Sequence, residues 1–312
     1  MIFHMKEQNN IKTVSVGIPA YNEEGNVGYL LKALLSQKER NFVLKEIVVV
    51  SDGSTDKTNE IVSGIHAKDA RVRLVVMPVR SGAYKAQNRI IEEFSGDILV
   101  MLDADILPEN DMYIQYMIEP FLHDKDIGIV SGKRIPLLGE TFVERVINFS
   151  DQIKQDIFAR MNDGDNVYLC HGDNRAFRGD FAKTIKWPPV LGEDAYSYFY
   201  CKEQGLRFYY EPRARVVYRA PQTLKDHLSR STRFFQSERR MSSYFSNLSV
   251  ERAYKLPLMT TVRIIVKHAI QHPVLFCGYL GMYCFAKISS RMQKDAAFAW
   301  KPATSSKTLV KK

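Results

Sequence analysis

The first half of the chain alternates short apolar runs, rich in β-branched residues, with amphipathic stretches of helical period. Repeated strand–helix units of this kind predict a doubly wound α/β domain, with a mostly parallel, Rossmann-like sheet and helices on both faces. In such a sheet, ligands bind at the carboxyl ends of the strands. The predicted strands are 14–19, 46–51, 71–77, 97–102 and 127–131, and the predicted helices are 26–37, 58–66, 82–94 and 108–121.

Acidic residues follow three of these predicted strands. The first strand ends in Pro19-Ala20-Tyr21-Asn22-Glu23-Glu24, which offers an aromatic ring and a carboxylate to a nucleotide. Asp52 follows the second strand, and Asp103-Ala104-Asp105 follows the fourth. Because the carboxyl ends of parallel strands meet at one edge of a sheet, we expect these residues to share one crevice.

The pair Asp103 and Asp105 is the candidate metal site. Two carboxylates separated by one residue can turn toward one ligand where a strand ends. Their hard oxygen atoms suit Mg²⁺ or Mn²⁺. The pair therefore predicts a divalent cation together with a ribose hydroxyl. Asp52 suits two roles, accepting a hydrogen bond from a nucleotide base or capping a helix, and the residues alone leave both open.

The composition and the remaining motifs exclude several classes. The chain has 44 Lys and Arg against 35 Asp and Glu, a net charge of +9 that favours nucleic acid, an anionic membrane or a phosphorylated substrate. No glycine-rich dinucleotide fingerprint follows a strand and no P-loop signature occurs, which disfavours dinucleotide oxidoreductases and P-loop NTPases. The 4 cysteines lack zinc or redox spacing, and the polar N-terminus lacks a signal-peptide core, so we expect a cytoplasmic protein.

The second half of the chain is less regular. Residues 268–286 contain no Lys, Arg, Asp or Glu, but a proline and two glycines make them a weak membrane span. Three arrangements stay open for them: a hairpin or helix on a membrane surface, a buried core helix, and a true span. The lysine-rich stretch 301–312 is expected to be disordered. The other predicted elements are helix 140–161, a short strand near 167–170, a helix from the 192–194 turn to 204, strands 206–210 and 214–218, and a basic helix 223–245.

Together these segments resemble the family-2 glycosyltransferases, which are inverting enzymes with the GT-A fold. The resemblance covers residues 12–241 and implies a UDP- or GDP-linked sugar as donor. It also implies specific donor contacts: Pro19, Ala20, Tyr21 and Glu23 at the nucleotide, Asp52 at the base, Asp103 at the ribose or metal, and Asp105 at the metal that bridges the diphosphate.

The resemblance extends to the acceptor side. Gly192-Glu193-Asp194 is similar to the acidic pair whose aspartate is the general base, and an inverting transfer needs one carboxylate to deprotonate the acceptor hydroxyl. Leu169-Cys170-His171-Gly172-Asp173 resembles the segment that lines the acceptor site, so the candidate sugar or acceptor contacts are His171, Gly172, Asp173 and Glu193. Arg230-Ser231-Thr232-Arg233-Phe234 resembles an arginine motif that holds a diphosphate, with Phe where Trp is usual.

Two departures from the family pattern affect these assignments. The family often has Gly-Lys at the start of the third helix, whereas here Gly82 is followed by Ala83 and the lysine is Lys85. Whether Arg80 or Lys85 contacts phosphate is therefore open. Gly192 stands where many synthases carry Thr.

We therefore predict a metal-dependent transferase acting on the hydroxyl of a cell-surface polysaccharide, glycolipid or polyprenyl-linked acceptor. A non-catalytic nucleotide-sugar-binding subunit of a membrane glycan-assembly complex is the alternative. Nucleic acid is disfavoured because an acidic crevice repels a polyanion. We expect location at the cytoplasmic face of the membrane, and four segments: a tail 1–11, a GT-A domain 12–245, a helical extension 246–300 with membrane association, and a basic tail 301–312.

Overall fold

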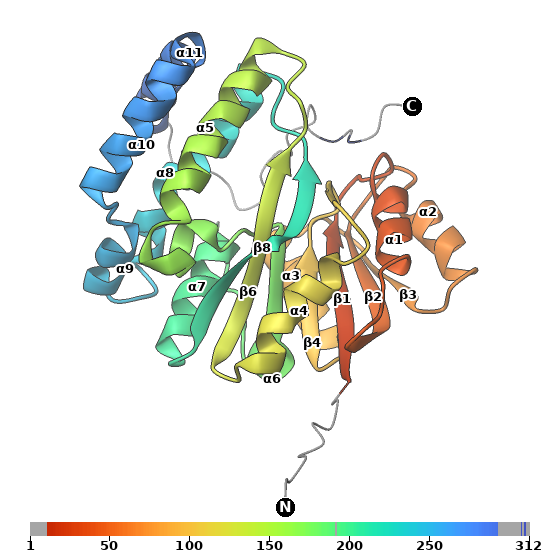
Figure 1. The fold of residues 1–312 in the computed structure, drawn as a ribbon. Coiled ribbons are helices and arrows are strands. Elements are labelled where there is room, and N and C mark those ends of the chain that lie inside the picture. Colours follow the sequence, from red (N-terminus) through yellow and green to blue (C-terminus); the bar gives the residue numbers. More distant parts are fainter. Residues whose placement is uncertain (1–10, 191, 293–306, 308, 310–312) are drawn as a thin grey trace, which may run out of the picture.

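The structure is a computed structural model that describes residues 11–190, 192–292, 307 and 309. A mixed eight-stranded sheet lies at its centre, in the order β3-β2-β1-β4-β7-β6-β8-β5 (Figure 1). The strands are β1 (Lys12–Ala20), β2 (Phe42–Asp52), β3 (Val72–Met77), β4 (Ile98–Leu102), β5 (Ile106–Pro108), β6 (Ile127–Pro136), β7 (Asn174–Arg178) and β8 (Arg207–Tyr218). The helices are α1 (Val27–Leu35), α2 (Thr58–His66), α3 (Ala83–Glu93), α4 (Tyr113–His123), α5 (Phe142–Phe158), α6 (Gly179–Ala182), α7 (Glu193–Glu203), α8 (Leu224–Met241), α9 (Asn247–Tyr254), α10 (Leu258–Gln271) and α11 (Pro273–Met292), with 3₁₀ turns η1 (Asn162–Gly164) and η2 (Val167–Leu169).

The predicted strand–helix alternation is confirmed for the first half of the chain. Strand β1 pairs in parallel with β2 on one side and with β4 on the other. The carboxyl ends of these three strands therefore lie at the same edge of the sheet, as the sequence predicts. Four of the seven strand pairs are parallel, so the sheet is mixed with a parallel majority.

Helices cover both faces of the sheet. On one face α1 and α4 bury apolar side chains such as Leu31 and Ile114, and on the other α3 and α7 bury Ile90 and Phe199. Each fully buried aliphatic or aromatic side chain of this size stabilises the fold by about 1.5–3 kcal/mol relative to leaving it in water. The two apolar layers hold the sheet rigid, so its carboxyl edge can position polar residues.

Three local predictions are wrong. Residues 167–170 form no strand, since Val167–Leu169 make a 3₁₀ turn and the next strand, β7, begins at Asn174. The two strands predicted at 206–210 and 214–218 are one continuous strand, β8, which crosses a register shift against β6. The helix predicted from Pro108 begins at Tyr113, because Ile106–Pro108 pair antiparallel with β8.

The C-terminal part of the chain is helical, as expected. Residues 268–286 form the end of α10 and most of α11, with a break at His272 and Pro273. Of all the helices in the described ranges, none is both long enough and apolar enough to cross a bilayer. Within the predicted disordered tail, Lys307 and Leu309 are described, and both pack against the loop before α1. The rest of 301–312 lies outside the described residues, so the expectation for that stretch stays a prediction.

Candidate active site

The start of α7 places Asp194 at the edge of a cavity. Gly192 precedes the helix with a φ of 109°, a conformation that suits glycine because a side chain there would be strained. Asp194 Oδ1 accepts the backbone N–H of Ala195 at 2.9 Å. A methyl group at Gly172 would lie 3.8 Å from Asp194 Oδ2. The 171–173 loop therefore lies next to that oxygen, and the lack of a side chain at Gly172 leaves space between them. The carboxylate is thus held by one oxygen while the other faces the loop.

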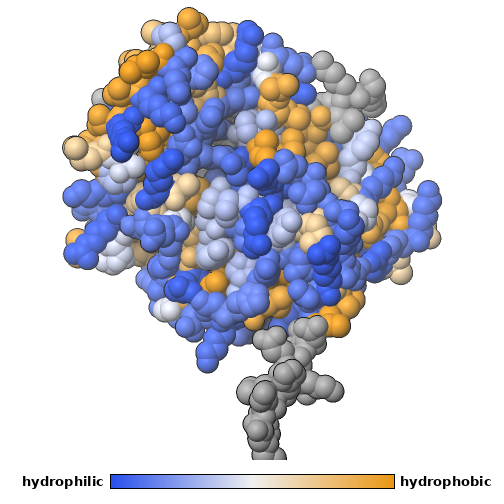
Figure 2. All heavy atoms as spheres, viewed as in Figure 1, coloured by the Kyte–Doolittle hydropathy of each residue, from blue (hydrophilic) through white to orange (hydrophobic). Residues whose placement is uncertain are grey.

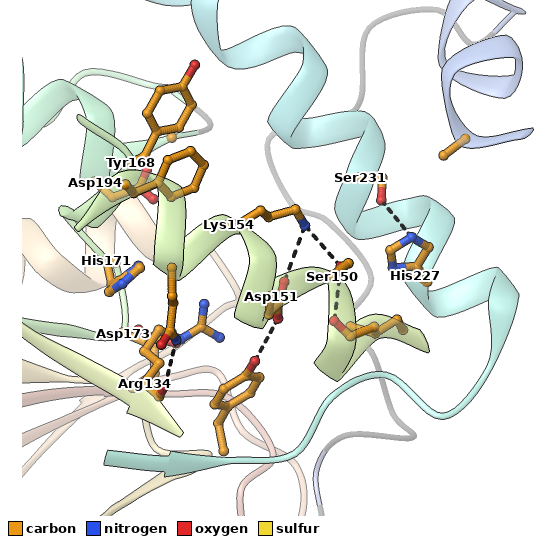
Figure 3. Close-up of a pocket in the computed structure, with 18 of the residues that line it drawn as sticks. Arg134, Ser150, Asp151, Lys154, Tyr168, His171, Asp173, Asp194, His227 and Ser231 are labelled. Carbon is orange, nitrogen blue, oxygen red and sulfur yellow. Dashed lines mark hydrogen bonds and ion pairs between the residues drawn. The ribbon is translucent and has the colours of Figure 1, made fainter. Parts of the chain in front are cut away.

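The cavity has a volume of about 430 Å³ and joins residues that are far apart in the sequence. At one end it gathers six of the predicted site residues, several of them labelled in Figure 3: Asp103, His171, Gly172, Asp173, Glu193 and Asp194. The opposite wall comes from α5, α8 and α11. Asp103, at the end of β4, and the α7 acids Glu193 and Asp194, predicted from separate motifs, therefore border one space. Glu23, Asp52 and Asp105 are not among the residues that line this cavity.

Acidic groups crowd this end of the cavity. Burial raises the pKa of Asp103 well above its ordinary value, and the nearby carboxylates of Asp105 and Asp173 raise it further. Burial also raises the pKa of Glu193. Like charges this close destabilise one another, so the site favours any cation that enters it.

Arg175, on β7, places a buried positive charge beside this acidic end of the cavity. Its side chain is fully buried and donates to Ser197 Oγ at 2.7 Å, to the carbonyl oxygen of Glu193 at 3.1 Å and to Gln87 Oε1 at 3.3 Å. The guanidinium also lowers the pKa of Asp103, against the effect of burial. Sequence analysis did not predict this residue, because an arginine in a short mixed segment carries no periodic signal.

A second arginine pairs with the 171–173 loop. Arg134 Nε lies 2.9 Å from Asp173 Oδ2, and both side chains are mostly buried (Figure 3). The guanidinium carbon of Arg134 also lies 4.1 Å from the ring centroid of Tyr218. These contacts fix the loop that carries His171 and Gly172. Arg134 was likewise absent from the predicted site.

The loop after β1 brings together the predicted nucleotide contacts. The guanidinium carbon of Arg80 lies 4.0 Å from the centroid of the Tyr21 ring. Burial raises the pKa of Glu23 to about 7, the Asp105 carboxylate raises it as well, and Lys307 acts in the opposite direction. Glu23 and Asp105 are therefore close enough to interact, which connects the β1 loop to the end of β4.

Asp52 binds the backbone of the segment that leads into α3, and not the helix that follows it in sequence. Its carboxylate accepts the backbone N–H groups of Ser81 at 2.6 Å and Gly82 at 2.8 Å, just before α3. The side chain is buried, and it fixes the segment that carries Arg80. Lys85 is exposed on the first turn of α3. Of the two candidates for phosphate contact, Arg80 is the one that packs against the predicted nucleotide loop, through the ring of Tyr21.

Known sequences identify the family of this chain. A sequence profile described as glycosyl transferase family 2 matches residues 15–185, which is more than half of the 312-residue chain. The chain belongs to glycosyl transferase family 2. The match includes the strand-end acids and the 171–173 loop but ends before Asp194.

Relatives of known sequence support the same membership. The probable glycosyltransferase YdaM of Bacillus subtilis is 36% identical over 152 residues, which are 46% of this chain and 34% of that protein. The poly-β-1,6-N-acetyl-D-glucosamine synthase of Staphylococcus aureus is 25% identical over 253 residues, which are 78% of this chain and 59% of that protein. The chain thus spans between about a third and three fifths of the length of these relatives.

Solved structures share the fold. The mannosyltransferase PcManGT from Pyrobaculum calidifontis, in complex with GDP-Man and Mn²⁺, has a TM-score of 0.59 at 19% identity and covers 93% of this chain and 78% of its own. S. aureus TarS 1–349, in complex with UDP-GlcNAc, has a TM-score of 0.53 at 20% identity and covers 67% of this chain and 58% of its own. The GT-A fold predicted for this family 2 member is confirmed.

The remaining predicted residues of this family 2 member divide into two groups. Pro19 and Ala20 end β1 at the carboxyl edge of the sheet, beside the described contacts of Tyr21. Arg230 and Arg233 fall on α8, but their side chains lie outside the part of the chain that the structure describes. Helix α8 itself borders the cavity through His227 and Ser231.

Asp103 and Asp105 are the residues that suit a divalent cation. In the described ranges, no three His, Cys, Asp or Glu side chains form a set able to hold a metal ion. Two carboxylates therefore supply only part of a coordination shell, which phosphate oxygens of a bound nucleotide can complete. The two carboxylates repel each other, because Asp105 raises the pKa of Asp103 in addition to the effect of burial. A bound cation reduces this repulsion. The donor set fits Mg²⁺ or Mn²⁺ with a diphosphate.

Proposed function

We propose that the chain is an inverting, metal-dependent glycosyltransferase that moves a sugar from a UDP- or GDP-linked donor to an acceptor hydroxyl. The observation that carries the proposal is the single cavity bordered by Asp103 on the β4 side and by Asp194 on α7. The first is the expected position of donor and metal, and the second is the expected position of the base. The complexes of PcManGT with GDP-Man and TarS with UDP-GlcNAc support a nucleotide-sugar donor.

The donor is bound at the carboxyl edge of the sheet in this proposal. Pro19, Ala20, Tyr21 and Glu23 contact the nucleotide, and Asp52 accepts a hydrogen bond from its base with the lone pairs that Ser81 and Gly82 leave free. Asp103 and Asp105 would hold Mg²⁺ or Mn²⁺, and the ion would stabilise the negative charge of the diphosphate. The Mn²⁺ in the PcManGT complex supports this assignment.

Asp194 acts as the general base in the transfer step. Its carboxylate takes the proton of the acceptor hydroxyl, the hydroxyl oxygen bonds to the anomeric carbon, and the bond from that carbon to the diphosphate oxygen breaks on the opposite side. The new glycosidic bond has inverted configuration, and the nucleoside diphosphate leaves as an anion. Arg230 and Arg233, on the cavity-lining helix α8, contact this diphosphate.

The acceptor enters through the rest of the cavity. His171, Gly172, Asp173 and Glu193 border the reacting end, where a sugar hydroxyl fits beside the carboxylates. The opposite wall mixes apolar and aromatic side chains, among them Phe158, Tyr279, Met282 and Tyr283. Aromatic rings beside polar groups suit an amphipathic acceptor. A glycolipid or a polyprenyl-linked glycan has this character, and a polysaccharide end can stack on the same rings.

Helices α10 and α11 support location at a membrane surface. They expose a row of apolar side chains along one side, which we call the α10–α11 surface: Leu258, Met259, Val262, Val266, Ile270 and Val274. Hydrophobic residues gather at the upper left of Figure 2, where Figure 1 places these helices. No Asp or Glu occurs in 252–292, whereas Arg and Lys occur six times. An exposed apolar row with basic neighbours suits an anionic bilayer.

Vesicle sedimentation tests the membrane part of the proposal. We expect the protein to sediment with phosphatidylglycerol-containing vesicles and not with phosphatidylcholine alone. Replacing Met259 and Ile270 by Ser should abolish this binding, whereas Val76→Ser, a change at an exposed valine of β3, should not. Equal sedimentation of both variants would contradict the membrane assignment.

Donor binding tests the proposed activity. We expect one of UDP and GDP to raise the melting temperature with Mn²⁺ and to lose this effect with EDTA, since a nucleotide at a hundred times its Kd stabilises by about 2.7 kcal/mol. Turnover of the matching nucleotide sugar with a membrane lipid extract then distinguishes an enzyme from a non-catalytic partner subunit. Binding without turnover would favour the partner, and no binding to either nucleotide would refute the proposal.

A further inference from the structure

The loop between β1 and α1 holds a lysine from the far end of the chain. Lys307 Nζ lies 2.7 Å from Glu23 Oε1 and donates to the carbonyl oxygens of Tyr21 at 2.6 Å and Asn22 at 2.8 Å. An ammonium group has three N–H donors, so these three oxygens satisfy it completely. The Glu23 side chain is only 9% exposed, and the pair is therefore shielded from water. This part of the loop is a pocket built for an ammonium group.

A second contact holds the backbone beside this lysine. The Asn26 side chain donates through Nδ2 to the carbonyl oxygen of Lys307 and accepts through Oδ1 the N–H of Leu309 at 3.1 Å. Asn26 is fully buried, and Leu309 is 8% exposed. One amide side chain therefore binds two backbone groups two residues apart, and an apolar side chain adds a further anchor. The site fits a segment with the pattern Lys-x-Leu.

The pocket adjoins the site proposed for donor and metal. Tyr21 and Glu23 belong to the predicted nucleotide loop, and the Glu23 carboxyl interacts with that of Asp105. Lys307 lies 5.8 Å from the centroid of the Tyr21 ring. A group that fixes this loop and neutralises Glu23 changes the charge that an incoming cation meets.

We propose that Lys307 and Leu309 form an intramolecular plug of the donor loop, which a divalent cation and its nucleotide must displace. The plug rests on the proposed function, since it acts on the same donor site. A cation held by Asp105 would repel the Lys307 ammonium and would attract the Glu23 carboxylate, which weakens the Lys307–Glu23 ion pair. Coupling between two binding events is reciprocal, so the docked plug weakens binding of the metal nucleotide by the same factor.

Calorimetric titration of the Mn²⁺ nucleotide measures this coupling. We expect Lys307→Gln to bind the complex about tenfold more tightly than the unsubstituted chain, within the usual range of such couplings. Lys32→Gln removes the same charge from an exposed position on α1 and should bind as the unsubstituted chain does. Equal or weaker binding by Lys307→Gln would overturn the competition.

Tryptic cleavage after Lys307 measures the plug itself, without any assay of transfer. Docking shields this lysine, so Leu309→Ser should increase the cleavage rate at that bond, read by mass spectrometry, and the Mn²⁺ nucleotide should increase it in the unsubstituted chain. A cleavage rate that neither change affects would overturn docking. If no variant binds a metal nucleotide, the proposed function and the competition both fail. If all variants bind it equally, the competition alone fails.

Discussion

Replacing Arg175 by Met should destabilise the protein by about 3 kcal/mol, because the change removes one of the two buried arginines, Arg134 and Arg175, that offset the buried acidic cluster. The guanidinium donates to Ser197, Glu193 and Gln87 from a fully buried position. The Glu193 carbonyl keeps two other donors, Trp187 Nε1 at 3.0 Å and Ser197 Oγ at 2.6 Å. The bonds from the guanidinium to Ser197 and Gln87 are therefore the main loss. Each contributes about 1.5–3 kcal/mol, and apolar packing of the methionine offsets part of the sum.

Urea denaturation at pH 7 measures this loss of stability. We expect a lower urea concentration at the midpoint of unfolding, with an unchanged dependence of the unfolding free energy on urea concentration. Arg89→Met is the matched control, since Arg89 forms ion pairs with Glu92 and Glu93 on the surface of α3 at 45% exposure. Exposed pairs contribute little, so the control should lose less than about 1 kcal/mol. A loss for Arg175→Met no larger than that of the control would refute the counter-charge argument.

The pH dependence gives an independent check on Arg175. The pKa of Asp103 is raised in the folded protein, by burial first and by Asp105 and Asp173 next, while Arg175 lowers it. A carboxyl group whose pKa is higher in the folded protein than in the unfolded chain binds more protons when the protein is folded. It therefore destabilises the protein increasingly as the pH rises from the unfolded pKa to the folded pKa. Without Arg175, the pKa of Asp103 in the folded protein is raised further. The stability deficit of Arg175→Met should therefore shrink as the pH falls through the raised pKa of Asp103, and a constant deficit would contradict this reasoning.

Three further outcomes are expected. Glu46→Ala should cost about 3 kcal/mol in urea denaturation, because this buried carboxylate accepts from Ser15, Ser95 and Arg73. Although burial alone would raise the pKa of Glu46, these bonds lower it, so its contribution is present above pH 4.5 and is lost as the pH falls through the lowered value; a Glu46→Ala deficit unchanged at acidic pH would contradict this. Gly172→Ala should fold normally, since its methyl meets only ordinary contacts at 3.6–3.8 Å, but should slow transfer by filling space at Asp194 while donor binding in calorimetry stays unchanged. Asp105→Ala should weaken Mn²⁺-dependent nucleotide binding, and unchanged affinity in the same titration would remove Asp105 from the metal site.

The elements that the sequence predicted correctly are those whose signal is local. Strand β4 and the centre of β2, residues 47–50, are continuous apolar runs, because helices cover both of their faces. Helix α1 shows its buried face as Leu30, Leu31 and Leu34. Strand β7 escaped prediction because its residues, Asn174 to Arg178, include two arginines and an asparagine. It exists through antiparallel pairing with β4 and β6, which no local pattern records.

The residues of the candidate site also fall into those that a local motif predicts and those that it does not. Motifs predicted Asp103, Asp173 and Asp194, and the structure brings these residues to one cavity. Arg175 and Lys307 could not be predicted, because their roles depend on partners distant in sequence. Lys307 contacts Tyr21 across 286 positions of the chain, and a polar lysine-rich stretch gives no sign of that contact.

The measurement that tests the account most directly compares Asp194→Asn with the unsubstituted chain, using the donor that the nucleotide screen identifies. The asparagine keeps the shape of the side chain and the hydrogen bond from Ala195, but it cannot take the acceptor proton. We expect transfer to fall by at least about a hundredfold, the lower range for loss of a general base, while the Kd of the Mn²⁺ nucleotide stays within about twofold. Transfer that persists near its normal rate, or donor binding that is lost with it, would contradict the role of Asp194 as the base.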